Sequence, residues 1–238
     1  MNTKSKEAKS LSIKVASLSY LMLCFISMVM GSCSNDKDQK DEVIVRITKD
    51  NLGQACDIIK EGLPYQSLSL VGLDSSTIEE IIECILDNNV NVKKLNIISS
   101  KLESTENISK LITLEALNIQ FSNIKNPSTN LTSLVNLEKL SLPSNHLKDL
   151  PNLEGLNIRL LDISYNNLKV IPNSVYSLTQ LVFLDIGGNN ISHISDSLKS
   201  LKKLKFLEIY DNDMSPEEIE KVKAMLPSVE VKEYMLMP

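Results

Sequence analysis

Between residues 92 and 214 the chain repeats one spacing of apolar residues, Leu-x-x-Leu-x-Leu-x-x-Asn-x-Leu in its most regular form. Six copies begin at residues 92, 114, 137, 158, 181 and 204, so 21 to 23 residues separate one copy from the next. The alternating apolar residues in the middle of each copy predict a short strand with one apolar face. Such a strand cannot bury its apolar face alone, so we expect the copies to stack into one continuous core.

One polar position recurs at the turn that follows each predicted strand. The first two copies have Ser100 and Ser122 there, and the later four have asparagine. A buried amide can satisfy backbone groups of neighbouring coils, because buried polar groups are nearly always hydrogen-bonded. We therefore interpret these asparagines as a structural ladder and not as catalytic or metal-binding residues. The four are Asn145, Asn166, Asn189 and Asn212.

The spacing closely resembles that of the leucine-rich-repeat family. The resemblance implies an α/β repeat solenoid, a right-handed superhelix with a parallel β-sheet on its concave side. It also implies that the concave side is the surface used for binding, since members of the family commonly bind through it.

The residues that flank the repeats predict two caps. Residues 43–91 contain two longer strand-helix turns, and the second helix opens with Ser76 and Glu79 at the spacing of a capping box. Residues 215–238 predict a helix that starts at Ser215 and a closing strand around Val231. Atypical ends of this kind are what a solenoid needs to shield its terminal core from water.

Residues 1–32 predict a leader that directs export. Four lysines precede an apolar run over residues 15–30 that is short for a membrane span. The run ends in Met30-Gly31-Ser32-Cys33, which resembles the lipobox of bacterial lipoproteins and implies that Cys33 is lipidated, for example with palmitate. Cys24 lacks small residues before it, so Cys33 is the favoured lipidation site. An ordinary cleaved signal peptide with an incidental cysteine is the alternative.

The segment after Cys33 contains no apolar residue, glycine or proline up to residue 42, so residues 33–42 predict a solvated, acidic tether. The tether resembles the export signal of Bacteroidetes lipoproteins, although a plain spacer would have the same composition. The resemblance implies a protein anchored by lipid in the bacterial outer membrane, with exposure on the cell surface as a further expectation.

The composition excludes several classes of function. A net charge of -5 argues against nucleic acid as a partner, because binding phosphates requires clustered cations. The chain has two histidines, His146 and His193, and no cysteine or carboxylate at metal-ligand spacing around them, so we expect surface histidines and no metal. Neither a phosphate-binding glycine loop nor a nucleophile elbow is present. We therefore expect no enzyme and no cofactor.

Cys56 and Cys84 are the two cysteines of the predicted folded part. An exported protein lives where disulfides can form. Nothing in the sequence brings the pair together, however, so two buried free thiols are the favoured interpretation and a disulfide is the alternative.

Residues between the inward leucines point out of the predicted sheet and form columns along it. In the last three repeats an apolar column lies beside an acidic one, and further columns add aromatic residues. Buried aromatic anchors with a polar rim are typical of protein interfaces. We therefore predict a surface that recognises a protein partner. A glycan-binding face, or a structural envelope protein without a specific ligand, are the alternatives. The predicted contact residues are Phe121, Leu160, Asp162, Tyr165, Phe183, Asp185, Phe206, Glu208, Tyr210 and Asp211.

Overall fold

The computed structural model describes residues 44–61, 66–102, 106–124 and 131–234 of the chain. The predicted leader, the lipidation of Cys33 and the tether lie outside the described residues. The repeats and both flanking units lie within the compact unit that spans residues 43–238.

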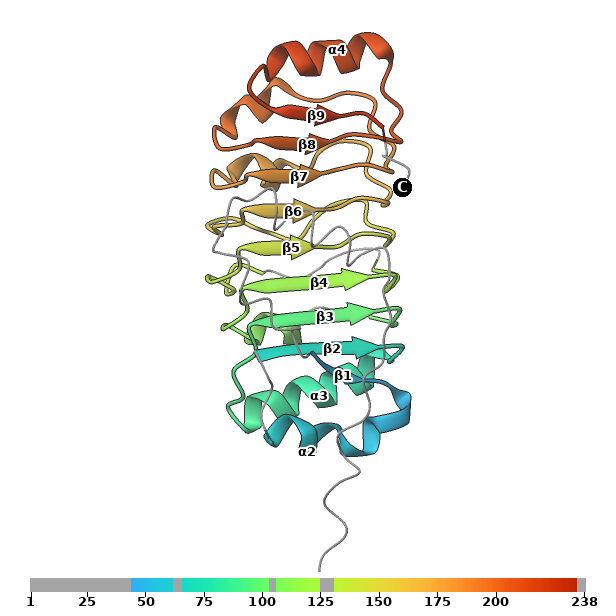
Figure 1. The fold of residues 1–238 in the computed structure, drawn as a ribbon, viewed down its shortest axis with the longest axis vertical. Helices are drawn as coiled ribbons and strands as arrows, with labels where there is room; N and C mark the ends of the chain where they lie inside the picture. The colour runs from blue at the N-terminus through green and yellow to red at the C-terminus, as the bar shows by residue number, and fades with distance from the viewer. Residues whose placement is uncertain (1–43, 62–65, 103–105, 125–130, 235–238) are drawn as a thin grey trace, which may run out of the picture. The chain divides into compact units, whose positions relative to one another are not determined.

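The described residues form one open sheet of nine parallel strands, which follow one another in chain order (Figure 1). The predicted fold class, a repeat solenoid with a parallel sheet, is thereby confirmed. The strands are β1 (Val45–Ile47), β2 (Ser67–Val71), β3 (Lys94–Ile98), β4 (Ala116–Gln120), β5 (Lys139–Ser141), β6 (Leu160–Asp162), β7 (Phe183–Asp185), β8 (Phe206–Glu208) and β9 (Glu230–Lys232).

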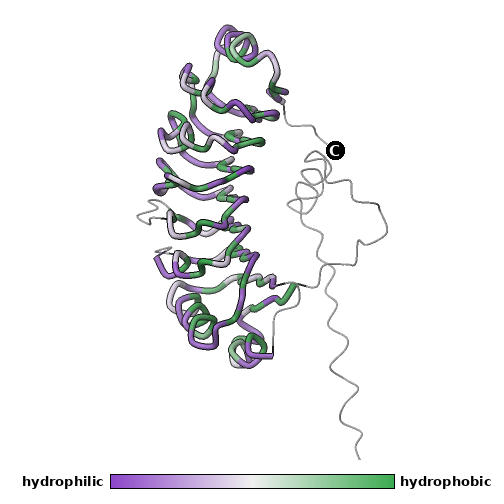
Figure 2. The backbone as a smooth tube through the Cα atoms, turned by 90° about the vertical axis from the view of Figure 1, so that its left-hand side faces the viewer, coloured by the Kyte–Doolittle hydropathy of each residue, from purple (hydrophilic) through white to green (hydrophobic). Residues whose placement is uncertain are grey.

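Short helical segments connect several of the strands on the side of the core opposite the sheet. The longest helices lie at the two ends of the strand stack (Figure 1). Apolar and polar stretches alternate along every coil, as Figure 2 shows. The helices are α2 (Ala55–Lys60), α3 (Ser75–Asp87) and α4 (Pro216–Met225), and the 3-10 segments are η1 (Lys49–Gln54), η3 (Asn107–Lys110), η4 (Asn173–Ser177) and η5 (Asp196–Ser200).

The inward leucines and isoleucines form one hydrophobic cluster that runs from Ile47 to Leu226. The same template position pairs with itself across the strands, as in Leu161 with Leu184 and Leu184 with Leu207. All three of these leucines have no exposed surface. Full burial of each stabilises the fold by about 2 kcal/mol relative to exposure. The core is therefore built by repetition of one contact from coil to coil.

Each asparagine at the template position bridges its own coil and the preceding coil. The Asn166 side chain donates to the carbonyl oxygens of Leu142, Ile163 and Ser164 at 2.9–3.0 Å, and it accepts from the amide of Leu147 at 3.1 Å. Asn145, Asn189 and Asn212 repeat this pattern in their own coils, and Asn212 is somewhat more exposed than the rest. These side chains therefore satisfy backbone amides and carbonyls in the turns that follow the strands.

Serine makes a shorter version of the same connection in the first two repeats. The Ser122 hydroxyl accepts from the amide of Ser100 at 3.3 Å and donates to the carbonyl of Gln120 at 2.9 Å. Ser100 makes the equivalent pair with Leu73 and Ile98. A serine thus provides two hydrogen bonds where Asn166 provides four.

The caps begin at well-defined residues, one of which differs from the prediction. Helix α3 is capped by Asp74, whose carboxylate accepts from the amide of Thr77 at 2.9 Å, so the predicted capping box of Ser76 with Glu79 is wrong. Ser76 instead donates its hydroxyl to Asp74. Helix α4 has Ser215 as its N-cap, as the sequence predicts.

Cys56 of α2 and Cys84 of α3 form a disulfide, with their Cα atoms 6.0 Å apart. The favoured interpretation of two free thiols is therefore wrong. The two helices pack side by side, and Cys84 lies at the margin of the core, so α3 brings the second cysteine to the first. No sequence pattern indicates this packing of one helix on the other.

We predict that Asn166→Ala lowers the free energy of unfolding by about 2 kcal/mol, because the buried amide of Leu147 loses its acceptor. Urea unfolding of the purified protein measures the change. Asn167→Ala is the matched control, since Asn167 is exposed and adjacent. Equal stability of the two variants would contradict a structural role for the ladder.

Candidate functional site

Strand pairing aligns the outward residues into two columns that run along the sheet face. On β6, β7 and β8 the first column is apolar and the second is acidic. The first column contains Ser67, Lys94, Ala116, Lys139, Leu160, Phe183, Phe206 and Glu230, and the second contains Arg46, Ser69, Asn96, Asn118, Ser141, Asp162, Asp185, Glu208 and Lys232.

The apolar column is less exposed than the sequence predicts for residues that contact a partner. Phe183 is only 5% exposed and Leu160 is buried as well, although neither belongs to the interior core cluster. Phe206 is half-buried. The three share one column, as the repeat spacing predicts, but Phe206 alone offers part of its side chain to a partner.

The acidic column is held by hydrogen bonds and an ion pair from its own and the neighbouring coils. Asp162 accepts from the hydroxyl of Ser141 at 3.0 Å and from the amide and hydroxyl of Ser164 at 3.0 and 2.7 Å. Glu208 pairs with Lys232 at 2.9 Å. Burial raises the pKa of Asp162, while the hydrogen bonds from Ser164 oppose this rise.

Asp185 lies in the middle of the acidic column and is fully buried. It accepts from the amide of Gly187 at 2.8 Å and from the hydroxyl of Tyr210 at 3.0 Å. Burial, and then the carboxylates of Asp162 and Glu208, raise the pKa of Asp185 well above its ordinary value. Burial also raises the pKa of Tyr210, as does the carboxylate of Asp185, so this phenol stays protonated and donates to Asp185.

Two tyrosines from different repeats meet over a pair of glycines. The rings of Tyr165 and Tyr210 have centroids 6.1 Å apart and are tilted by 51°. A Cβ atom on Gly187 would come within 2.4 Å of the Tyr210 ring, and one on Gly188 within 2.5 Å of the Tyr165 ring. Gly187 and Gly188 therefore make room for both rings. Sequence reasoning missed this cluster, although two consecutive glycines in one repeat with a tyrosine in each adjacent repeat are a signal for it.

The residue before each ladder position has left-handed backbone. Ser144, Tyr165 and Asp211 have φ values of 54°, 52° and 50°, and Gly188 occupies the same position with φ 62°. Phe121 also has this conformation, with φ 52°, and is 60% exposed. Left-handed backbone is unfavourable for bulky side chains and often occurs at functional sites. Phe121 and Tyr165 are therefore exposed aromatic residues on a strained edge of the sheet.

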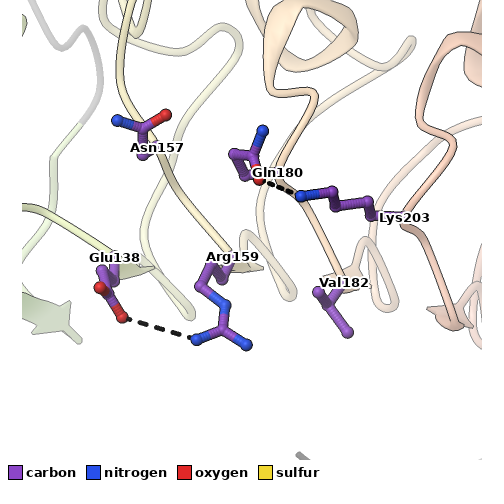
Figure 3. A pocket seen from close by; sticks show the side chains of 6 residues that line it. All are labelled: Glu138, Asn157, Arg159, Gln180, Val182 and Lys203. Atoms are coloured by element: carbon purple, nitrogen blue, oxygen red, sulfur yellow. Dashed lines mark hydrogen bonds and ion pairs between the residues drawn. The ribbon is translucent and has the colours of Figure 1, made fainter.

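A pocket of about 380 Å³ lies at the other edge, where the chain enters the strands (Figure 3). Arg159 and Glu138 face each other there at 3.9 Å, and Lys203 contacts Gln180. The side chains at this edge are largely polar and exposed. The residues that line the pocket are Glu138, Asn157, Arg159, Gln180, Val182 and Lys203.

The described residues include no group of three or more His, Cys, Asp or Glu side chains that could hold a metal ion. His146 is exposed, and His193 lies 2.9 Å from Glu218, which also accepts from the amide of Ile194. Glu218 thus connects helix α4 to the repeat that begins at residue 181. Within the same residues no helix has the length and apolar character needed to cross a membrane.

Comparison with known proteins identifies the repeat. Residues 156–214 match the family described as leucine rich repeat. Internalin C2 of Listeria monocytogenes shares the fold with a TM-score of 0.53 at 20% identity, over 70% of this chain and 68% of the internalin. The chain therefore contains a leucine-rich-repeat domain and has the fold of a leucine-rich-repeat solenoid.

A leucine-rich-repeat protein of Leptospira interrogans matches with a TM-score of 0.49 at 25% identity. The match covers 69% of this chain, which spans 46% of the Leptospira protein. No curated protein matches the chain.

We predict that Gly187→Ala lowers the free energy of unfolding by about 2 kcal/mol, because the added methyl group displaces the Tyr210 ring from Asp185. Chemical unfolding measures the loss. In a Tyr210→Ala background the same glycine substitution should have little effect. Gly53→Ala is the control, since no atom lies within 4 Å of its added Cβ. An undiminished cost in the Tyr210→Ala background would contradict the proposed packing.

Proposed function

We propose that this chain is a non-catalytic, lipid-anchored protein of the bacterial envelope that recognises another protein through the outward face of its sheet. The observation that carries the proposal is a set of three aromatic residues outside the core, Phe121, Tyr165 and Phe206. Stacked repeats present a broad, shallow surface of the kind that suits a protein or polymer better than a small metabolite.

The distribution of side chains supports a protein as the partner. Rigid aromatic residues are enriched at protein interfaces because they bury much area and lose little conformational entropy. Phe206 lies beside the acidic column, so apolar contact and charge complementarity are available at neighbouring positions. Complementary charge increases the specificity and the rate of association.

We predict that a photo-cross-linking residue at position 206 yields one protein adduct of defined mass in the producing cells. The same residue at position 170 should yield none, because Val170 is 64% exposed but lies outside the strands of the sheet. Gel electrophoresis and mass spectrometry identify the adduct. Equal adducts at both positions would contradict the proposal. A glycan adduct at position 206 would favour carbohydrate recognition, and no adduct would favour a structural envelope protein.

The anchor rests on the lipobox-like residues 30–33 and on the acidic residues that follow them. The disulfide between Cys56 and Cys84 supports an oxidising compartment, which the bacterial envelope provides. We propose that mature protein begins at Cys33 and is held in the outer membrane, with its repeats exposed on the cell surface. Several acyl chains on one cysteine suffice for stable anchoring, since each buried methylene contributes about 0.8 kcal/mol.

We predict that Cys33→Ser abolishes incorporation of a clickable palmitate analogue into the protein. Cys24→Ser is the matched control and should leave labelling unchanged, because small residues precede Cys33 and not Cys24. Fluorescence of the labelled band, normalised to protein amount, is the measurement. Persistent labelling of Cys33→Ser would rule out this anchor.

A further inference from the structure

Tyr165 exposes part of its ring to solvent near the carboxylate of Asp211. The residue is 39% exposed, and its ring lies across Gly188. Because Gly188 has no side chain, the ring of Tyr165 extends over it toward the coil of Asp211, which has the same left-handed backbone position two coils further on. Asp211 is itself exposed. The ring and this carboxylate therefore lie on the same edge of the sheet face, with only Gly188 between them in the column.

The electrostatic surroundings of Tyr165 are those of a cation subsite. Burial raises the pKa of Tyr165, and the carboxyl groups of Asp211 and Asp185 raise it further. Of these two groups Asp185 is buried, so Asp211 is the exposed carboxylate that a ligand on the ring can contact. The face of an aromatic ring attracts a cation electrostatically, and nearby carboxylates add to this attraction. Lys232 is held by Glu208 at 2.9 Å, so it neutralises the far end of the acidic column.

The tyrosine pair fixes the ring in place. Tyr210 contacts Tyr165 from the neighbouring column and is itself held by its hydrogen bond to Asp185. The ring of Tyr210 fills the space above Gly187, as that of Tyr165 does above Gly188. A fixed ring loses less entropy when it contacts a ligand. The cluster is thus preorganised for a contact with the exposed part of Tyr165.

We propose that Tyr165 and Asp211 form a subsite for a cationic side chain, arginine or lysine, of the protein that lies on the sheet face. This inference rests on the proposed function and specifies that the partner carries a basic residue at this position. The charged residues of the two sheet columns agree with it. The cations of the N-terminal strands are Arg46, Lys94 and Lys139 on β1, β3 and β5, and β6 to β9 carry four carboxyl groups, Asp162, Asp185, Glu208 and Glu230, against one cation, Lys232, which is paired with Glu208. A basic part of the partner therefore lies over the C-terminal repeats.

Phe121 is a matched control within the same molecule. It has the same left-handed backbone and the same column position as Tyr165, and it is more exposed. Its two neighbours in that column are Ser99 and Ser144, which carry no charge. A ligand that merely adheres to exposed aromatic rings would contact Phe121 at least as well as Tyr165, whereas a cation subsite requires the carboxylates near Tyr165.

The test is a titration of the full chain, labelled with ¹³C in its aromatic rings, followed by NMR. N-acetyl-arginine amide and N-acetyl-lysine amide are the cationic probes, and N-acetyl-citrulline amide is the neutral counterpart of the first. We expect a saturable shift of the Tyr165 ring signals with the cationic probes and none at Phe121. The two cationic arms decide between arginine and lysine as the better ligand.

Two variants complete the experiment. Asp211→Asn should weaken binding of the cationic probes about threefold, whereas Asp213→Asn, an exposed carboxylate on the same turn, should leave it unchanged. Equal shifts with citrulline, or equal shifts at Phe121, would overturn the proposal, and so would full binding by Asp211→Asn. Adduct formation from position 206 would still support the proposed function in that case, so the two can fail separately.

Discussion

Contact of one coil with the next is the interaction on which this structure depends. A strand of three residues can neither bury its apolar face nor satisfy its backbone alone. Both needs are met only by the neighbouring coil, through inward residues such as Leu161 and Leu184 and through the amides of Asn145, Asn166 and Asn189. The two ends of the stack lack one neighbour, and helices α2 and α3 lie at the N-terminal end and helix α4 at the C-terminal end in its place.

Because the inward residues and the asparagine ladder hold the coils together, the outward residues are not needed for the fold and can form a binding surface. The fold requires inward apolar residues and the ladder, but it does not require Phe121 or Tyr165 to be aromatic, since serine and glycine occupy the same backbone position in other repeats. Placing large rings in left-handed backbone costs stability. This loss of stability occurs at positions that face solvent, where the exposed rings are available to contact a partner.

The sequence predicts what depends on spacing and misses what depends on packing between distant residues. The strand register follows from the repeat length, so the columns through Asp162, Asp185 and Glu208 could be aligned without a structure. The disulfide of Cys56 with Cys84 could not be found, because it depends on how α2 lies against α3. The fit of Tyr165 and Tyr210 over two glycines, and the burial of Phe183, likewise depend on side-chain directions that no periodicity contains.

The central claim is that the outward sheet face, and not the loops behind it, is the recognition surface. Hydroxyl-radical footprinting of the free protein and of its complex with the captured partner tests this claim most directly. Oxidation of Phe206 and Tyr165 should fall in the complex, whereas Val170, which is exposed outside the sheet, should be oxidised equally in both states. Protection of Val170 without protection of Phe206 and Tyr165 would show that the partner binds elsewhere and would contradict the account.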